Sequence, residues 1–432
     1  MKPLSRYSCF VAITACLSGF LFGYYMAIVS GALTFISSAF QFSIGKESLF
    51  VSVILLGAVL GSSMGGYLTN RFGRKNVFFL TSFFLILGCI LLVNANSFSI
   101  LLVSRIIQGV SIGTISVVTP LYLGEISPNA HRGRIVSTYQ LMMNFGILCA
   151  YIVNDLFIST GNWQMMFLVG LIPLILQIVF LFFIPESPLW LFGKKQKTLA
   201  LEVLKKLQLP TSFEPVKEKK TKIDTKTVSF LLWIGILLSA FQQITGINIV
   251  IYYAPRIFYE AGYTSSLSAM IATTILGVAN LVACFMSVWL LDRVGRRKLL
   301  LIGVFGMMIS LLCFSIFSYS KSSFIDELSM VLLIAYIFFF SMGIGPVTWV
   351  LLSEIYPPEI RDKAMSFSLL TNWIAVFFVL WTFPYLLAWI KIPGTFGLYS
   401  LMNLVAFLFI LKNIPETKQK SLVEVFKIFK RK

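Results

Sequence analysis

The sequence has little of what a soluble enzyme uses for chemistry. Only 12% of its 432 residues are charged, roughly half the share of an ordinary soluble domain. The single histidine, His131, lies in a basic loop, and no zinc-ligand spacing, phosphate-binding loop or nucleophile elbow occurs. We therefore expect no enzymatic activity, no cofactor and no metal site.

A disulfide framework is excluded by where the six cysteines stand. All of them lie in or at the edge of apolar stretches, where cysteine behaves as a small apolar residue. Apolar residues are what the chain has in excess, at 58% with a mean hydropathy of +0.88. Stretches such as Val77–Val93 and Met330–Leu352 are long enough to cross a hydrocarbon core of about 30 Å. A dozen of them in succession could not all be covered by protein, so the sequence predicts a membrane protein.

The charges predict how the chain crosses the lipid bilayer. With the first loop outside, 30 of the 35 Lys and Arg residues fall in cytoplasmic segments, as the positive-inside rule requires. This bias explains the net charge of +18 without a nucleic-acid partner, and no obligate protein partner is evident. It places both termini in the cytoplasm, and we expect a cell (inner or plasma) membrane. We predict twelve spans, at 9–29, 50–69, 77–94, 99–122, 135–155, 163–184, 228–252, 267–291, 298–318, 328–352, 364–390 and 395–412.

Three segments occur twice in the same order, which indicates a duplicated architecture. The loop "GGYLTNRFGRKN" around Arg71 returns as "SVWLLDRVGRRK" around Arg293, and "LYLGEISPNAHRGR" returns as "VLLSEIYPPEIRDK". "PESP" at Pro185 returns as "PETK" at Pro415, and the three offsets along the chain are nearly equal. Two six-helix halves of this kind are typical of transporters. We predict halves at 1–190 and 228–416, a cytoplasmic linker with short helices at 191–227 and a basic tail at 417–432.

These motifs resemble the sugar porter branch of the major facilitator superfamily over essentially the full length of the chain. The resemblance rests on "GFLFGY" at Gly19–Tyr24, "NRFGRK" at Asn70–Lys75, "PLYLGEISP" at Pro120–Pro128, "PESPLWL" at Pro185–Leu191, "QQITGIN" at Gln242–Asn248, "YYAP" at Tyr252–Pro255 and "GPVTWVLLSEIYP" at Gly345–Pro357. It implies an all-α membrane protein of the major-facilitator type, with twelve transmembrane helices in two pseudo-symmetric halves. It also implies alternating-access transport of a monosaccharide, a hexose or a pentose.

Side-chain amides at membrane depth are suited to a sugar, because each amide offers a donor and an acceptor to a hydroxyl. Gln242, Gln243 and Asn248 cluster around Gly246, where the backbone can approach a ligand. Trp349 and Trp373 offer flat faces to sugar C–H groups, and Tyr252 is a further candidate contact. The amides could instead tie helices together. By resemblance, the sugar-contacting positions are Gln140, Gln242, Gln243, Asn248, Asn280, Trp349 and Asn372.

The cytoplasmic repeats predict a gate. Acidic residues stand at the inner ends of spans beside loop arginines, at matching positions in both halves. Ion pairs between the halves would hold the inner mouth shut. The candidate gate residues are Arg71, Arg74, Glu125, Arg132, Asp292, Arg293, Arg296, Arg297, Glu354 and Arg361.

Tyr25 departs from the pattern of proton-coupled sugar porters, which by resemblance have an Asp there as partner of the arginine at Arg105. None of the 17 acidic residues lies near the middle of a predicted span, and tyrosine, with a pKa near 10, titrates far from working pH. A lone cation in a membrane is costly, so we expect Arg105 to contact Tyr24 or Tyr25 by cation–π interaction or hydrogen bonding. We expect a uniporter.

Three other functions are compatible with the sequence. A proton–sugar symporter would need a proton carrier other than an Asp at position 25. A carrier for polyols, organic anions or drugs could use the same scaffold. A sugar sensor would need a long cytoplasmic tail, and only about twenty residues follow Lys412, so we expect transport.

Overall fold

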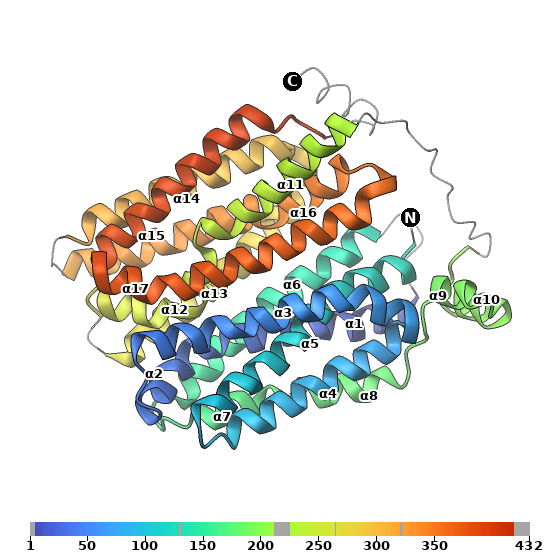
Figure 1. The fold of residues 1–432 in the computed structure, drawn as a ribbon, viewed down its shortest axis with the longest axis horizontal. Helices are drawn as coiled ribbons and strands as arrows, with labels where there is room; N and C mark the ends of the chain where they lie inside the picture. Colours follow the sequence, from blue (N-terminus) through green and yellow to red (C-terminus); the bar gives the residue numbers. More distant parts are fainter. Residues whose placement is uncertain (1–4, 129–131, 211–224, 264, 320–322, 419–432) are drawn as a thin grey trace. The chain divides into compact units, whose positions relative to one another are not determined.

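The structure is a computed structural model that describes residues 5–128, 132–210, 225–263, 265–319 and 323–418 (Figure 1). Within these ranges the regular structure is helical and contains no strand. The chain forms two compact units, the first comprising 1–42 and 49–216 and the second 43–48 and 217–432. The described part of the predicted linker, 191–210, belongs to the first unit and contains the end of α9 (Pro188–Gly193) and all of α10 (Lys197–Lys206). Residues 211–224 of the predicted linker and nearly all of the predicted tail lie outside the described residues.

The first unit contains ten helices among its described residues. In it α1 packs against α5 and α6, and α4 packs against α5. Only the first turn of α3 belongs to the second unit. The helices are α1 (Arg6–Ala27), α2 (Val29–Ala39), α3 (Ile44–Phe72), α4 (Arg74–Val93), α5 (Phe98–Ile126), α6 (Arg132–Phe157), α7 (Trp163–Val169), α8 (Leu171–Leu181), α9 (Pro188–Gly193) and α10 (Lys197–Lys206).

The second unit contains seven helices among its described residues. In it α14 packs against α15 and α17, and α11 packs against α17. The helices are α11 (Thr225–Ile244), α12 (Ile247–Glu260), α13 (Ser266–Val294), α14 (Arg296–Phe317), α15 (Ser323–Met342), α16 (Ile344–Ile355) and α17 (Pro358–Asn413).

The helices confirm the predicted membrane architecture. Eleven helical stretches of the described chain are long and apolar enough to cross a membrane, and several, such as α11 with α12, join two helices. The last stretch, Lys363–Asn413, has 51 residues, about twice what one crossing needs. Its backbone leaves the helical region at Lys391, with φ 56° and ψ −175°. Two helical spans therefore lie within α17, as the twelve-span prediction requires.

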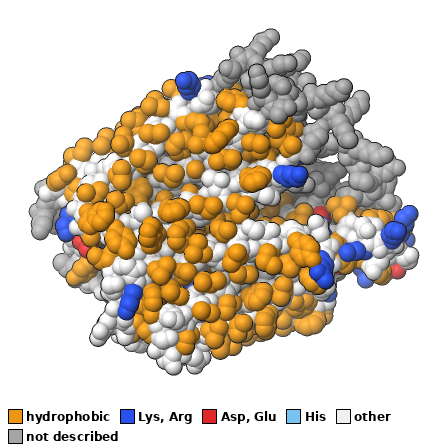
Figure 2. Space-filling view, viewed as in Figure 1, with side chains coloured by type: hydrophobic (Ala, Val, Ile, Leu, Met, Phe, Trp, Pro, Cys, Tyr) orange, Lys and Arg blue, Asp and Glu red, His pale blue; other side chains and the backbone are white. Residues whose placement is uncertain are grey.

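Large apolar side chains are exposed on most of these helices, as a protein surrounded by lipid tails requires. Figure 2 shows hydrophobic side chains spread over the visible face. Ile172 is 68% exposed, Phe182 67% and Trp233 62%. In water such a surface would drive aggregation, whereas in a bilayer it is solvated.

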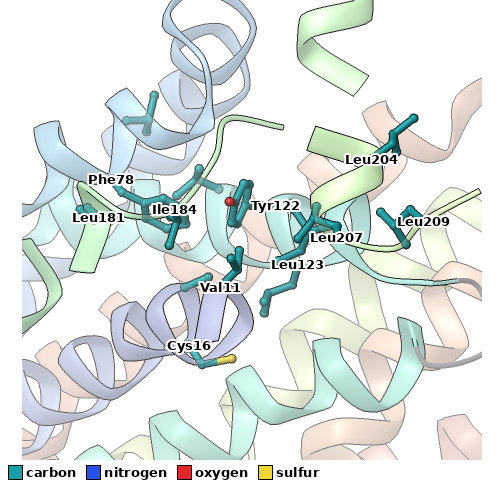
Figure 3. Packing of buried hydrophobic residues seen from close by; sticks show 14 residues of the cluster. Val11, Cys16, Phe78, Tyr122, Leu123, Leu181, Ile184, Leu204, Leu207 and Leu209 are labelled. Carbon is teal, nitrogen blue, oxygen red and sulfur yellow. The ribbon is translucent and has the colours of Figure 1, made fainter. Parts of the chain in front are cut away.

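Inside the first unit, a buried apolar cluster joins the spans to the helices that follow them (Figure 3). Phe78 of α4 meets the ring of Tyr122 of α5 edge to face, with centroids 5.6 Å apart. Leu204 of α10 and the following Leu207 belong to the same cluster. Ser8 of α1 donates its hydroxyl to the Leu207 carbonyl at 3.0 Å. The helix α10 is therefore anchored to the first unit by burial and by a hydrogen bond.

Candidate functional site

Four side-chain amides meet inside the second unit and form one hydrogen-bonded group. Gln242 and Gln243 end α11, Asn248 lies in the first turn of α12, and Asn372 lies on α17. Gln243 Nε2 donates to Asn372 Oδ1 at 3.2 Å and to Gln242 Oε1 at 3.3 Å. Asn372 Nδ2 donates to Gln242 Oε1 at 2.7 Å, and Asn248 Nδ2 donates to Gln243 Oε1. We call these four residues the amide cluster.

The amide cluster is fixed to neighbouring backbone. Gln242 Nε2 donates to the Gly345 carbonyl of α16 at 2.6 Å and to the Ile344 carbonyl at 3.3 Å. Asn372 Nδ2 also donates to the Ser239 carbonyl at 3.2 Å. Gln242, Gln243 and Asn372 are buried, whereas Asn248 is half-buried. These hydrogen bonds fix the direction of the amides before a ligand arrives.

Such a cluster can bind a neutral polyhydroxyl solute. A hydroxyl is both a donor and an acceptor, and it can insert between two amides by replacing one amide–amide hydrogen bond with two amide–hydroxyl bonds. A charged ligand would find no opposite charge among these four side chains. The group is therefore chemically matched to a sugar and poorly matched to an ion.

The other predicted contact residues occupy several helices. Asn280 of α13 accepts a hydrogen bond from the Ser341 hydroxyl of α15 at its Oδ1. Tyr252 and Trp373 are buried in the second unit, and Trp349 is half-buried there. Gln140 is half-buried on α6 of the first unit. Contact between these five residues and a substrate stays a prediction.

Arg105 is fully buried on α5, as is Tyr25 on α1. Arg105 Nη1 donates to Gln108 Oε1 at 2.9 Å and to the Tyr25 backbone carbonyl at 3.5 Å. Its guanidinium lies over the Phe50 ring, 5.7 Å from the centroid. We expected Arg105 to contact Tyr24 or Tyr25. The described hydrogen bond reaches Tyr25 through its backbone, and the described cation–π contact is with Phe50.

Where α3 is followed by α4, the first unit has a group of contacts around Arg74. We call this group and its counterpart in the second unit the inner contacts, because the sequence predicts these span ends to be cytoplasmic. Arg74 forms a two-pronged ion pair with Glu125, its Nη2 lying 2.6 Å from Oε1 and its Nε 2.8 Å from Oε2. Both side chains are buried. Glu186 accepts the backbone N–H groups of Arg74 and Lys75 at 2.8 and 3.1 Å. It thereby caps the N-terminus of α4, where the helix dipole favours negative charge.

The second unit repeats these inner contacts. Arg296 Nη2 lies 2.9 Å from Glu354 Oε1, and Glu416 accepts the backbone N–H groups of Arg296 and Arg297 at 2.9 and 3.2 Å. Gly73 and Gly295 precede the capped helices with φ of 92° and 100°, a conformation that favours glycine. The repeat seen in the sequence is thus a repeat of contacts.

The two carboxylates that cap these helices differ in acidity. Burial raises the pKa of Glu186 above the ordinary 4.5, although backbone N–H donors and Arg74 act in the opposite direction. Burial also acts to raise the pKa of Glu416, but backbone N–H groups of Lys418, Arg296, Arg297 and Thr417 outweigh it and lower that pKa. The difference follows from burial being deeper at Glu186.

Three more candidate gate residues have partners within their own units. Arg71 Nη1 donates to the Tyr67 hydroxyl, Arg293 stacks on Trp289 with 3.7 Å to the ring centroid, and Arg361 Nε donates to the Tyr356 carbonyl at 3.3 Å. The side chains of Arg132 and Asp292 lie outside the described residues. We expected ion pairs between the halves, whereas Glu125 and Glu354 each pair inside their own unit. Pairs between the halves stay a prediction.

Several residues of these sites were not singled out by the sequence analysis. Gln108 stands three residues after Arg105, one helical turn away, which was a usable signal. The repeated "PE" of the PESP and PETK motifs marked Glu186 and Glu416, but the motif did not show that they cap helices. Ser341, the partner of Asn280, has no distinguishing sequence signal.

Comparison with known proteins agrees with this geometry. The family described as "Sugar (and other) transporter" matches residues 11–429. The galactose–proton symporter of Escherichia coli K12 is 35% identical, covering 96% of this chain and 93% of its own. The D-xylose–proton symporter of the same strain is 34% identical, covering 98% and 95%.

Solved structures show the same fold. The xylose transporter of E. coli in a partially occluded inward-open conformation superposes with a TM-score of 0.86 at 31% identity, covering 97% of this chain and all of that one. The same transporter bound to 6-bromo-6-deoxy-D-glucose, a proton:xylose symporter of the major facilitator superfamily, superposes with a TM-score of 0.81 at 30% identity, covering 99% and 100%. The sequence match, the apolar spans and the repeated inner contacts agree, and the chain belongs to the sugar transporter family of the major facilitator superfamily.

Proposed function

We propose that the protein moves a monosaccharide, a hexose or a pentose, across the membrane by alternating access. The observation that supports this most directly is the amide cluster, in which four uncharged side chains with paired donors and acceptors are held together within the second unit. The relatives named for galactose and D-xylose bind solutes of the same chemical class. The positive-inside charge pattern further supports cytoplasmic termini in a cell membrane.

The experiment is counterflow in proteoliposomes with a panel of pentoses and hexoses, together with a polyol and an organic anion. We expect exchange of at least one monosaccharide and none of the anion. Exchange of the polyol in preference to every monosaccharide would instead identify a polyol carrier, and exchange of none of the solutes would contradict the proposal.

We further propose that transport is uniport. Tyr25 occupies the position at which proton-coupled relatives are expected to have an Asp, and the side chain of Arg105 bonds to an amide and to the Tyr25 backbone carbonyl. Neither of these two acceptors titrates near neutral pH. No acidic residue stands near the middle of a predicted span. No carboxylate is therefore evident that could couple proton movement to sugar transport.

Proton–sugar symport is the second candidate, because the similar transporters of known substrate are named as proton symporters. Uptake into proteoliposomes at equal inside and outside sugar, with and without an imposed proton gradient, separates the two candidates. A uniporter gives no accumulation in either condition. Accumulation that follows the gradient and collapses with a protonophore would establish symport.

We also propose that the inner contacts around Arg74 and Arg296 belong to the gate. In each unit a cation, a paired glutamate and a capping glutamate join two helix ends to the segment that carries the capping glutamate. Helix ends joined in this way move as one rigid body. Each half can therefore rotate between conformations while the contacts at the cytoplasmic ends of its helices stay intact.

A further inference from the structure

The two helices that contribute most of the amide cluster are separated by a break in the backbone. The helix α11 ends at Ile244 and α12 begins at Ile247, with Gly246 between them at φ 99°. In a continuous α-helix, the Thr245 carbonyl would accept the N–H of Ile249. Here the Ile249 N–H donates to the Gly246 carbonyl at 3.1 Å. The break thus takes away the ordinary partner of the Thr245 carbonyl.

This carbonyl receives two side-chain donors in exchange. The Tyr336 hydroxyl of α15 donates to it at 2.9 Å, and Asn403 Nδ2 of α17 donates to it at 3.3 Å. Thr245, Tyr336 and Asn403 are all fully buried. A bare carbonyl is costly in a membrane interior, where no bulk water can replace the lost partner. The two donors therefore stabilise the broken backbone over a continuous helix.

A third residue limits the movement of the break. The ring of Tyr399 lies against Gly246, where an added Cβ would be only 3.0 Å from Tyr399 Cδ1. Asn403 Nδ2 also donates to the Tyr399 carbonyl at 2.8 Å. The side chain that bonds the Thr245 carbonyl is thus tied to the backbone of the residue that packs against Gly246.

The break determines how the amides face one another. Gln242 and Gln243 precede it and Asn248 follows it, so a rotation at Thr245 or Gly246 moves Asn248 relative to both glutamines. Asn248 is bonded to Gln243 across the break.

We propose that Tyr336 and Asn403 are positioning residues for the amide cluster, and that they act by clamping the Thr245 carbonyl. The inference rests on the proposed sugar-transport function. Neither residue needs to touch the substrate, because each sets the angle between α11 and α12 and thereby the spacing of the amides that bind it.

The test uses Tyr336→Phe, which removes one oxygen and keeps the ring, and Asn403→Leu, which removes the donor at similar volume. Tyr253→Phe is the matched control for the first, because the Tyr253 hydroxyl of α12 is buried with no hydrogen-bond partner in the described part of the chain. Asn413→Leu is the control for the second. Like Asn403, Asn413 donates to the carbonyl four residues earlier on α17, at 3.0 Å, but it is the last residue of that helix.

The first measurement is amide hydrogen exchange in peptides covering residues 241–252, without sugar. We expect at least tenfold faster exchange at 245–249 in Tyr336→Phe and in Asn403→Leu, and unchanged exchange in both controls. Unchanged exchange in Tyr336→Phe and Asn403→Leu would overturn the clamp.

The second measurement is counterflow of D-xylose and D-galactose by the same variants. We expect the half-saturating concentration to rise about fivefold or more while the maximal rate stays within about twofold, and the controls to match the wild type. Faster hydrogen exchange with an unchanged half-saturating concentration would overturn the positioning role. If the wild type exchanges neither sugar nor any other monosaccharide, the proposed transport function fails, and hydrogen exchange alone decides whether the clamp exists.

Discussion

At the scale of single residues, the amide cluster shows which polar side chains are committed to one another before any ligand binds. Gln242 is the most constrained of the four, because its Nε2 bonds two backbone carbonyls and its Oε1 accepts from Asn372 and Gln243. Loss of Gln242 therefore leaves several buried groups without partners, each at a cost of roughly 1–3 kcal/mol.

Replacement of Gln242 or Asn248 by Ala tests the assignment of the sugar site. We expect the half-saturating sugar concentration in counterflow to rise roughly tenfold for each, which corresponds to about 1.4 kcal/mol of lost binding. Asn94→Ala serves as control, because Asn94 is an exposed amide whose side-chain hydrogen bond in the described part of the chain stays within its own helix turn. Wild-type flux in both Gln242→Ala and Asn248→Ala would show that the sugar binds elsewhere.

The capping glutamates predict an order of protonation. The raised pKa of Glu186 means that it takes up a proton above pH 4.5, whereas Glu416 stays ionised below that value. By linkage, the stability that ionised Glu416 contributes is complete above pH 4.5 and is lost as the pH falls through its lowered pKa. Protonation of Glu186 instead favours the folded state as the pH falls from above its raised pKa to 4.5.

Infrared difference spectra between the wild type and each of Glu186→Gln and Glu416→Gln can follow the two carboxyl bands separately. We expect the Glu186 band to titrate first on acidification. The reverse order would mean that burial at Glu186 is less than the structure indicates.

At the scale of helices, the repeated ion pairs join elements that lie far apart in the sequence. The Arg74–Glu125 pair is more deeply buried than the Arg296–Glu354 pair, with side-chain exposures of 8% and 7% against 13% and 27%. Removal of one partner from a buried pair leaves an uncompensated charge, which costs more as burial increases.

Glu125→Gln should therefore destabilise the protein more than Glu354→Gln. We expect a loss of roughly 3 kcal/mol for the first, by comparison with other buried pairs, and about 1 kcal/mol for the second, because partial exposure screens its charges. Thermal unfolding in detergent gives the ranking, and cysteine accessibility from the two sides of the membrane shows whether the outward/inward balance also shifts. Arg74→Met combined with Glu125→Leu is the control, because it removes both charges and should lose less than Glu125→Gln alone.

The helices were largely predictable from the sequence, while the contacts between them were not. Apolar length and positive-inside charge are local properties, so they located the spans, and Lys391 even interrupts α17 where a loop was expected between spans. The partner of Glu125 was not predictable, because sequence spacing showed several arginines at the same membrane face without showing which one it reaches. The break at Gly246 was indicated by the glycine, but Tyr336 and Asn403 lie on helices much further along the chain, and nothing local connects them to it.

At the scale of the whole molecule, duplication explains why both units have the same inner contacts while the described amide cluster lies in one unit. Arg74, Glu125 and Glu186 correspond one to one with Arg296, Glu354 and Glu416. The positions of Gln242 and Gln243 show no such correspondence in the sequence signatures that revealed the repeat. The repeated residues hold helix ends together in both units. We expect the residues that select the substrate to be among those that are not repeated.

Because of that separation, we expect substrate choice to be transferable between relatives by exchange of a short segment. The stretch 228–260 contains three of the four clustered amides and none of the residues of the inner contacts. A chimaera that receives this stretch from the galactose–proton symporter should acquire a changed order of preference among sugars, measured by competition in counterflow, while its thermal unfolding stays close to that of the parent. Under this proposal, diversification within such a scaffold would need only a short exchange of sequence, because the parts that hold the helix ends together lie outside the exchanged segment.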